Sequence, residues 1–407
     1  MKFDVSKIRK QFPALSAEVC GWNLHYLDNA ATSQMPINVI DAVMRHEITA
    51  RGNVQRGAHH LAERATQAYE GARASVARFL NAASASEVVF TSGTTAAINL
   101  LAHSLGSTLG PGDEIVITAA EHHSNYVPWL MLQKRVGVRI RILPVTAEGE
   151  LDLNQLSSLV SDRCKLIALT QCSNVTGAET DVAPVVKVAR EVGAQVLLDG
   201  AQMVPHGPVD VQALGVDYYV FSAHKCFAPN GVGVLWIRSC DSRSLSPFMG
   251  GGGMVSAVSD DQVVYAQGNS MFEAGTPAIA QAVGLGKALD WMMDLRWSEI
   301  RQHEQQLLQL MLDGLSDIRG LSILGPAEVE KKLPVVSFAV KDAHPHDICH
   351  LLNERGVALR GGHHCAQPLL DALGVSSVSR ASLALYNNEE DVLALIDGVA
   401  RAVRILR

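Results

Sequence analysis

Short apolar runs recur along the first 240 residues, and stretches with a helical pattern separate most of them. Seven runs are rich in Val, Ile, Leu or aromatic residues and have the length of typical strands. They are 87–91, 113–118, 139–143, 165–170, 195–199, 217–221 and 231–237. Strands that alternate with helices form βαβ units, in which helices cover both faces of a sheet. The pattern therefore predicts an α/β fold with a mostly parallel central sheet.

Two regions depart from this alternation. Runs 217–221 and 231–237 are too close for a crossover helix, so we expect an antiparallel pair at the edge of the sheet. Residues 36–80 have a helical pattern instead, which is clearest in the amphipathic stretch LAERATQAYEGARASVARFL at 61–80.

The pattern changes again after the four glycines at 250–253. Long amphipathic helices are expected first, then short strands mixed with helices, which predicts a smaller α+β domain. The expected helices are 277–294, 297–316, 346–355 and 388–405, and the expected strands are 321–324, 335–340 and 357–360. We predict three parts: an N-terminal segment (1–20) that packs with the small domain, a large domain (21–285) and a small C-terminal domain (286–407).

Composition narrows the class of protein. The chain has 48% hydrophobic and 18% charged residues, as in proteins with a large buried core. Its net charge of −7 argues against a nucleic-acid or anionic-membrane partner, because both bind basic surfaces. We expect no signal peptide and no membrane-spanning helix. The seven cysteines lack CxxC spacing, which favours free thiols in a reducing cytoplasm.

Two ionisable side chains lie where apolar strands end. Lys225 follows the run 217–221, and Asp199 ends the run 195–199, 225 − 199 = 26 residues earlier. Ligands of α/β sheets bind at strand ends, and pyridoxal 5′-phosphate (PLP) needs both a lysine for its aldehyde and an acid at its pyridine nitrogen. The alternatives are a solvated lysine and an aspartate that caps the next helix.

Other polar residues could complete such a cofactor site. Thr94 and Thr95 lie between a strand and an amphipathic helix, where backbone donors bind phosphate, although an ordinary helix cap is the alternative. Ser222 and His224 flank the lysine and could add donors. His122 follows the strand 113–118 and is our candidate to stack on the ring and move protons, but it could equally be a surface histidine.

The segment RGGHHCAQPLL (360–370) contains a candidate nucleophile, Cys365. Adjacent histidines and Arg360 could favour the reactive thiolate, although an inert buried cysteine is the commoner case. Zinc bound by His363, His364 and Cys365 is disfavoured, because three consecutive residues rarely converge on one ion. Arg360 and Arg380 are candidates to bind a substrate carboxylate, which a guanidinium can hold with two hydrogen bonds.

Taken together, these segments resemble the group II cysteine desulfurases, the SufS/CsdA branch of the class V aminotransferase-like PLP enzymes. The matching segments run in the family's order across nearly the whole chain: YLDNAAT, TSGTTAAINL, EHHSNYVPW, SNVTG, LLDGAQ, FSAHK, FEAGTP, RGGHHCAQPLL and RASLALYN. The resemblance implies a fold type I PLP-dependent transferase that works as a homodimer. It also implies release of sulfur from L-cysteine as an enzyme persulfide, with formation of L-alanine.

The resemblance further implies a role for each candidate residue. Lys225 would hold PLP as a Schiff base, Asp199 would meet the pyridine nitrogen and Cys365 would accept the sulfur. The other cofactor contacts would come from Thr94, Thr95, His122, Gln202 (at the phenolic oxygen), Ser222, His224 and, from the partner subunit, Thr276. The substrate carboxylate would bind Asn174 and Arg380.

The sequence departs from the family pattern near these residues. Ala223 replaces the usual Gly before His-Lys, and Cys226 replaces the usual Leu after it. Ser92 stands where Arg is usual, and Gln55 where His is usual. None of these changes removes a core catalytic group, but they affect expectations about the entrance to the site and the dimer contact.

Several functions stay open beside the desulfurase. The same site could serve a selenocysteine lyase or a cysteine sulfinate desulfinase. A more distant alternative is a PLP aminotransferase, which needs no nucleophilic thiol, and another is a PLP-free scaffold that binds a partner. For a desulfurase, we expect a SufE/CsdE-type sulfur-acceptor protein and a role in sulfur transfer, such as iron–sulfur cluster supply.

Overall fold

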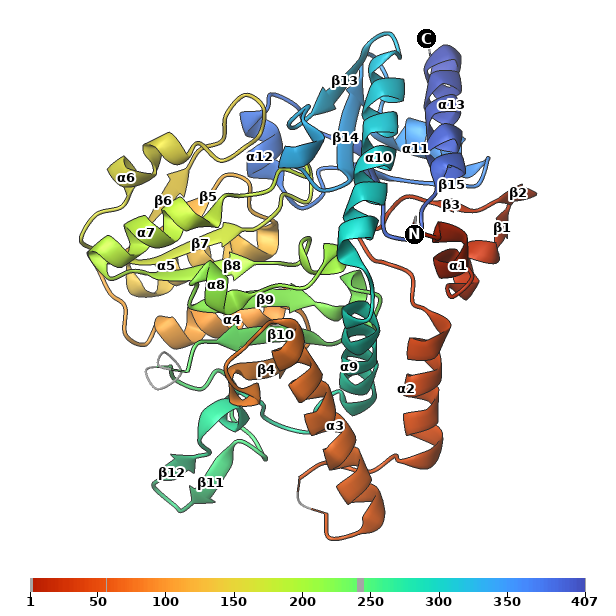
Figure 1. The fold of residues 1–407 in the computed structure, drawn as a ribbon. Coiled ribbons are helices and arrows are strands. Elements are labelled where there is room, and N and C mark those ends of the chain that lie inside the picture. The colour runs from red at the N-terminus through yellow and green to blue at the C-terminus, as the bar shows by residue number, and fades with distance from the viewer. Residues whose placement is uncertain (1–2, 56, 240–244, 407) are drawn as a thin grey trace.

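The computed structural model describes residues 3–55, 57–239 and 245–406, and its largest element is a seven-stranded sheet (Figure 1). Across this sheet the strands follow the order β4 (Val88–Thr91), β10 (Gly233–Ile237), β9 (Tyr218–Ser222), β8 (Gln195–Asp199), β7 (Cys164–Thr170), β5 (Glu114–Thr118) and β6 (Arg139–Leu143). All pairs from β9 to β6 are parallel. The predicted α/β fold with a mostly parallel sheet is therefore confirmed.

One detail of the predicted topology is wrong. Strand β10 pairs antiparallel with β9, as expected, but it also pairs antiparallel with β4, so β4 and not β10 lies at the edge. The close fit of β10 against the neighbouring turn depends on Gly233. A Cβ atom there would lie 2.5 Å from the Cα atom of Gly93. The contact joins residues far apart in the sequence, which local patterns do not reveal.

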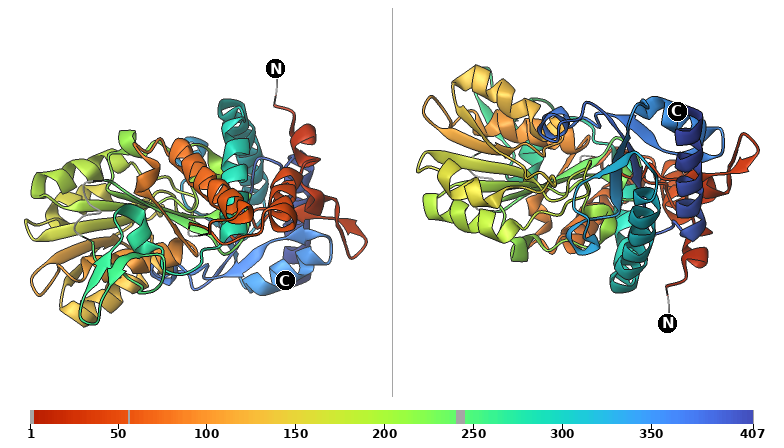
Figure 2. Two further views of the ribbon diagram at one scale, coloured as in Figure 1. Left: turned by 90° about the horizontal axis from the view of Figure 1, so that it is seen from below. Right: turned by 90° about the horizontal axis from the view of Figure 1, so that it is seen from above.

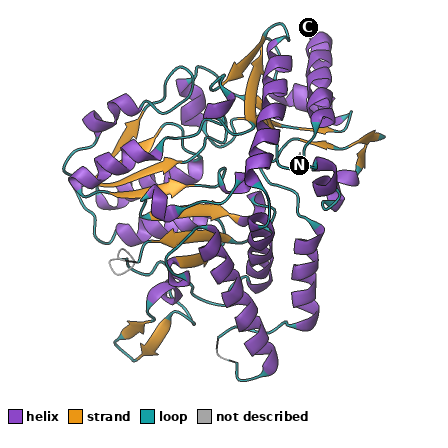
Figure 3. Ribbon diagram, viewed as in Figure 1, coloured by secondary structure: helices purple, strands orange, loops and turns teal. Residues whose placement is uncertain are grey.

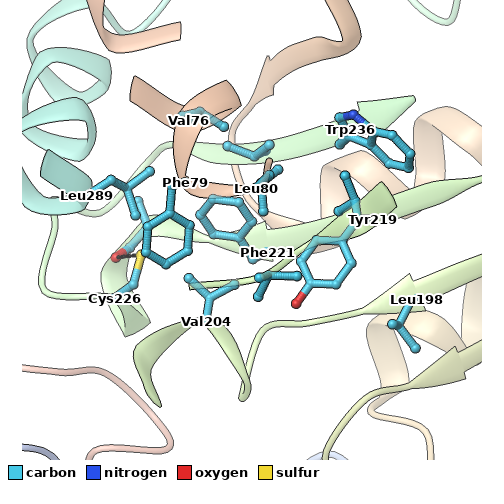
Figure 4. Packing of buried hydrophobic residues seen from close by; sticks show 14 of the residues in the cluster. Val76, Phe79, Leu80, Leu198, Val204, Tyr219, Phe221, Cys226, Trp236 and Leu289 are labelled. Carbon is cyan, nitrogen blue, oxygen red and sulfur yellow. Dashed lines mark hydrogen bonds between the residues drawn. The ribbon is translucent and has the colours of Figure 1, made fainter. Parts of the chain in front are cut away.

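The central strands are buried on both faces because their side chains alternate between two apolar clusters. In β9, Tyr219 and Phe221 belong to one cluster, whereas Tyr218 and Val220 belong to the other. Figure 4 shows the first cluster around Phe221. Helices α3 (His60–Phe79), α7 (Val182–Val192) and α9 (Ile279–Met293) cover the first face, and α4 (Thr94–Leu105) and α5 (Val127–Val136) cover the second. Figure 2 shows both helical layers.

The C-terminal part contains a second, antiparallel sheet. Its strands follow the order β13 (Leu321–Leu324), β14 (Val335–Val340), β17 (Val378–Ser382) and β16 (Arg360–Gly362). Helices α10 (Trp297–Ser316), α11 (Pro345–Asn353) and α13 (Glu389–Leu406) share one apolar cluster with it. The elements predicted for this part are confirmed, except that the strand expected at 357–360 is split into β15 (Val357–Ala358) and β16.

The N-terminal residues lie against this second sheet and its helices (Figure 3). Strand β3 (His25–Tyr26) pairs in parallel with β15. Arg9, in α1 (Val5–Arg9), forms an ion pair of 2.9 Å with Asp391 at the start of α13. The beginning of the chain therefore contacts its C-terminal part. The exact division into domains stays a prediction.

The remaining elements are short or peripheral. The helical region predicted at 36–80 consists of two helices, α2 (Ile37–Thr49) and α3, which both pack on α9. The hairpin of β11 (Val255–Val258) and β12 (Val263–Tyr265) projects from the lower end of the molecule in Figure 1. Other short elements are β1 (Glu18–Val19), β2 (Trp22–Asn23), α6 (Leu156–Leu159), α8 (Val211–Leu214) and α12 (Gln367–Ala372). No described helix combines the length and apolar character that crossing a bilayer requires.

Candidate active site

A cavity of about 480 Å³ lies where the carboxyl ends of β7, β8 and β9 face the loops of the second sheet. All of the predicted site residues except Thr276 line it. They are Thr94, Thr95, His122, Asn174, Asp199, Gln202, Ser222, His224, Lys225, Arg360, Cys365 and Arg380. The fold therefore brings residues from seven separate sequence segments into one site. Strand ends of a parallel sheet are where such sites form.

Lys225 reaches the cavity from a short 3₁₀ turn (Ala223–Lys225) directly after β9. Burial lowers the pKa of its amine to about 8, because an apolar surrounding disfavours the ammonium form, while the nearby Asp199 partly opposes this shift. A substantial fraction of the amine is therefore neutral near physiological pH. The neutral amine is the form that reacts with an aldehyde.

Asp199 ends the neighbouring strand β8 and is only 4% exposed. Its Oδ1 atom accepts a hydrogen bond of 3.0 Å from the backbone N–H of Ala201, and burial raises the pKa of its carboxyl. The next residue, Gly200, cannot be larger, because a Cβ atom there would lie 1.9 Å from the Oη atom of Tyr219. The turn places Gln202 nearby, whose Nε2 donates to the carbonyl of Ala30 at 2.9 Å.

The start of helix α4 gives this part of the cavity the features of an anion site. Helix α4 begins after Gly93, whose φ of 153° lies in a region that favours glycine. The backbone N–H of Thr94 donates to the Oγ atom of Ser222 at 2.8 Å, and the two hydroxyl oxygens are also 2.8 Å apart. The first N–H groups of a helix and nearby hydroxyls are suitable donors for a phosphate.

His122 lies just before a 3₁₀ turn (His123–Asn125) and is oriented by that turn. The backbone N–H of Ser124 donates to its Nδ1 atom at 3.1 Å, so the neutral ring carries its proton on Nε2. Burial, and then the charge of Lys225, lowers the pKa of His122 to about 3. The imidazole is therefore neutral at physiological pH.

A buried carboxyl behind His122 was not predicted as part of the site. Glu121 accepts hydrogen bonds from the backbone N–H of Thr170 at 2.9 Å and from the Nδ2 atom of Asn125 at 2.6 Å. Burial raises its pKa to about 8. Glu121 joins the ends of β5 and β7 to the turn that carries His122. The sequence signal that could have identified Glu121 is the position of an acidic residue shortly after an apolar strand.

Cys365 lies in the loop between β16 and α12, and its side chain is exposed. Two hydrogen bonds attach this loop to the large sheet's side of the cavity. The backbone N–H of His123 donates to the carbonyl of Cys365 at 2.7 Å, and the Nδ2 atom of Asn174 donates to the carbonyl of His364 at 2.8 Å. His364 and Cys365 both have left-handed backbone conformations, with φ of 50° and 54°, respectively.

Positive charge near Cys365 comes from two arginines and from Lys225. Burial lowers the pKa of His364 to about 3, so this ring is neutral and does not stabilise a thiolate by its charge, contrary to our expectation for this one of the two adjacent histidines. Arg360 and Arg380 both interact electrostatically with Cys365. Among the described residues, no group of three or more His, Cys, Asp or Glu side chains is placed to hold a metal ion.

The two arginines lie opposite each other on β16 and β17, and a second unpredicted residue connects them. Asp28 contacts the Nε atom of Arg360 at 3.0 Å and an Nη atom of Arg380 at 3.2 Å. Arg380 is buried, and one Nη atom donates to the carbonyl of Asn174 at 3.0 Å. Its Nε atom has no hydrogen-bond partner within the described part of the chain, so it can still receive a polar ligand.

Thr276 is the one predicted site residue outside this cavity. It lines a different pocket together with Asn53, Gln55 and Gly252, and its Oγ1 atom is 3.5 Å from the Nδ2 atom of Asn53. A contribution of Thr276 to the site of a partner subunit stays a prediction.

Comparison with known proteins adds independent findings. A family model described as aminotransferase class-V matches residues 25–395. The chain is 45% identical to a cysteine desulfurase of Yersinia pestis (strain Pestoides F), and the match covers 100% of both chains. It superposes on the crystal structure of the cysteine desulfurase CsdA from Escherichia coli with a TM-score of 0.92, at 39% identity and full coverage of both chains. The apo cysteine desulfurase from Thermococcus onnurineus NA1 gives a TM-score of 0.93 at 35% identity, covering 98% of each chain.

Proposed function

This chain belongs to the class-V aminotransferase family and, within it, to the cysteine desulfurases, and on this basis we propose how its cavity works. The cavity takes L-cysteine, transfers the substrate sulfur to Cys365 and releases L-alanine. The observation that carries this proposal is that Lys225 and Cys365, from two different sheets, line the same cavity.

Enzymes of this family use PLP, and the cavity residues fit that cofactor. Lys225 offers an amine with a lowered pKa, and the buried Asp199 has a raised pKa that a cationic ring nitrogen would lower again. The start of α4 offers donors for the phosphate. The residues that would hold PLP are Lys225, Asp199, Gln202, His122, Thr94, Thr95, Ser222 and His224. When bound, PLP supplies an electron sink for carbanion chemistry at the substrate Cα atom.

Residues of the chain itself bind the substrate, transfer its proton and attack its sulfur. Arg380 and Asn174 orient the substrate carboxylate, for which the Nε atom of Arg380 is available. Lys225, as the neutral amine, takes the proton from Cα, and His122 holds a proton on Nε2. The thiolate of Cys365 attacks the substrate sulfur, and the Cβ–S bond breaks. The reaction balances, since a thiol and L-cysteine give a persulfide and L-alanine.

The persulfide on Cys365 has to pass to an acceptor thiol, and the exposure of Cys365 suits this transfer. The acceptor in our proposal is a SufE/CsdE-type protein, and the pathway is sulfur supply for iron–sulfur clusters. We place the enzyme in the reducing cytoplasm, which keeps such a thiol free. We also propose a homodimer, in which Thr276 of the partner subunit would complete each phosphate site.

A substrate panel tests this function. Purified holoenzyme is incubated with L-cysteine, L-selenocysteine or L-cysteine sulfinate, and alanine is measured together with the released sulfide, selenide or sulfite. Under a reductant that clears the persulfide, we expect alanine and sulfide from L-cysteine in a one-to-one ratio. A keto acid in place of alanine would indicate an aminotransferase, and no product from L-cysteine would refute the proposal.

A further inference from the structure

Glu121 is a fully buried carboxyl outside the cavity lining, although the next residue, His122, lines the cavity. Both of its oxygens accept hydrogen bonds from fixed donors. The Oε1 atom accepts from the hydroxyl of Thr118 at 2.5 Å and from the backbone N–H of Thr170 at 2.9 Å. The Oε2 atom accepts from the Nδ2 atom of Asn125 at 2.6 Å. Loss of a buried acceptor would leave these donors unpaired, which costs free energy.

The two oxygens of Glu121 join different parts of the fold. The Oε1 atom contacts the ends of two neighbouring parallel strands, because Thr118 ends β5 and Thr170 ends β7. The Oε2 atom contacts the turn that follows His122. This turn is closed by the backbone N–H of Asn125, which donates to the carbonyl of His122 at 2.8 Å. Glu121 therefore fixes the turn, and the imidazole that the turn carries, relative to the large sheet.

Trp129, in α5, determines which way these hydrogen bonds run. Its Nε1 atom donates to the Oδ1 atom of Asn125 at 3.0 Å, so the NH₂ group of that amide has to face Glu121. Trp129 and Asn125 are both 0% exposed, so their polar atoms are removed from solvent. A glutamine at position 121 would place its own NH₂ group against the N–H of Thr170 or against the amide of Asn125. Only a carboxyl accepts from both sides.

The pKa of His122 depends on how deep its ring lies in the cavity. Burial, and then the charge of Lys225, lowers this pKa from 6.5 to about 3. Both effects weaken when the ring moves toward solvent, so the pKa of a displaced imidazole rises again. The protonation of His122 therefore reports the position of its ring.

We propose that Glu121 is a positioning residue for the desulfurase reaction: through Asn125, it holds the imidazole of His122 at the depth in the cavity that proton transfer requires. Glu121 acts through His122, since its own carboxyl does not line the cavity. The inference rests on the proposed function, in which His122 holds a proton on Nε2.

The experiment follows the exchange of the hydrogen on the Cε1 atom of each histidine for deuterium, which mass spectrometry measures without turnover. This exchange proceeds through the imidazolium form, so a pKa higher by one raises the imidazolium fraction at neutral pH about tenfold. In Glu121→Gln, exchange at His122 should be about tenfold faster or more. It is measured in the holoenzyme and in the cofactor-free chain. His206, a buried histidine that pairs with Glu304, is the internal reference and should not change.

A reversed pair tests whether the hydrogen bonds carry the effect. In Glu121→Gln/Asn125→Asp, the new amide donates to the new carboxyl, which can still accept from Trp129. Exchange at His122 should therefore return to within about threefold of the wild-type rate. If Glu121→Gln folds poorly, Asn125→Ala provides the same test. It removes only the contact with the turn, and it should also accelerate exchange at His122.

The matched control is Glu87→Gln. Glu87 is another buried carboxyl, 4% exposed, which accepts from the Nε1 atom of Trp236 at 3.0 Å and from the backbone N–H of Ala83 at 3.1 Å. It lies outside the cavity lining, so its variant should lose thermal stability but keep the wild-type exchange rate at His122. Equal acceleration in the Glu87 and Glu121 variants, or none in either Glu121→Gln or Asn125→Ala, would overturn the role of Glu121.

Turnover separates this result from a failure of the proposed function. In Glu121→Gln holoenzyme, kcat for alanine release should fall about tenfold, because proton transfer is impaired, while KM for L-cysteine changes little. A wild-type enzyme that forms no alanine would refute the desulfurase function, yet exchange in the cofactor-free chain would still decide the role of Glu121. Normal exchange and normal kcat in the variant would refute only that role.

Discussion

The two walls of the cavity are built in different ways. One wall, the cofactor wall, consists of residues at the ends of buried parallel strands, with Asp199 on β8 and Lys225 after β9. The other wall is a loop of the small sheet that carries Cys365, with an exposed side chain and a left-handed backbone. Burial shifts the pKa values on the first wall, as with the amine of Lys225, which is lowered to about 8.

This difference corresponds to two chemical tasks. Chemistry on a cofactor needs groups with shifted pKa values and fixed positions, which a buried strand end provides. Transfer of sulfur to another protein needs a thiol that an outside group can reach, which an exposed loop provides. The hydrogen bonds from His123 and Asn174 hold the loop against the cofactor wall.

Removing the central group of the cofactor wall should have the largest effect. We expect Lys225→Ala to lower alanine production about 10³-fold or more, because both the attachment point of PLP and the group that moves the Cα proton are lost. The variant should keep part of its PLP noncovalently through the phosphate site. The measurements are alanine release and the PLP content before and after denaturation. Lys341→Ala, at an exposed lysine, is the control, and a Lys225 variant within tenfold of wild type would contradict the assignment.

Removing the nucleophile should leave the cofactor wall intact. Cys365→Ala should keep the absorbance of bound PLP while alanine release from L-cysteine falls about 100-fold or more, since only the attack on sulfur is lost. The matched control is Cys226→Ala. Cys226 is fully buried beside Phe79 and Leu289 (Figure 4), and burial raises the pKa of its thiol. Wild-type rates in the Cys365 variant would point to another thiol, first to Cys172, which also lines the cavity.

The shifted pKa of Lys225 predicts a moderate effect of pH on the cofactor wall. The pKa of the amine is about 8, below its ordinary value of 10.5, so the reactive neutral form increases up to about pH 8. Covalent capture of PLP by the cofactor-free protein should speed up about tenfold per pH unit below 8 and level off above it. Stopped-flow absorbance at fixed PLP measures this rate, with free lysine as the control. A rate that still rises between pH 9 and 10 would exclude the lowered pKa.

The sequence predicted most of the cofactor wall for a physical reason. Parallel strands end at the same edge of a sheet, so Lys225, Asp199 and His122 could be expected together once their strands were recognised. The helix start at Thr94 could be recognised in the same way, because backbone donors at a helix N-terminus follow from local structure. For these residues, the local sequence pattern is enough to predict their position in the fold.

The rest of the site depends on contacts between distant segments. Asp28 reaches the arginines because its backbone pairs with Ser382, 382 − 28 = 354 residues later, and no local pattern encodes that pairing. The edge position of β4 results from a similar long-range pairing with β10. The neutral state of His364 follows from burial by the folded chain, whereas its sequence neighbours suggested a cationic site.

The smallest predicted effect is a difference in folding stability that reports backbone strain on each of the two walls. Cys365 has φ of 54°, a conformation that costs a residue other than glycine about 1–2 kcal/mol. Glycine removes this cost but loses about 0.5–1 kcal/mol through the greater freedom of its unfolded chain. Cys365→Gly should therefore be more stable than Cys365→Ala, by roughly 0–1.5 kcal/mol. Both variants lack the thiol, so the comparison isolates the backbone.

At a position on the cofactor wall, the glycine variant should instead be less stable than the alanine variant. Ser222 has an ordinary φ of −110°, so a glycine there relieves no strain and only adds freedom to the unfolded chain. Ser222→Gly should be less stable than Ser222→Ala by about 0.5–1 kcal/mol. Thermal unfolding of the four cofactor-free variants, at one protein concentration and scan rate, measures both differences without a contribution from PLP binding. If glycine destabilises both positions equally, the loop of Cys365 stores no strain, and the two walls differ only in burial and exposure.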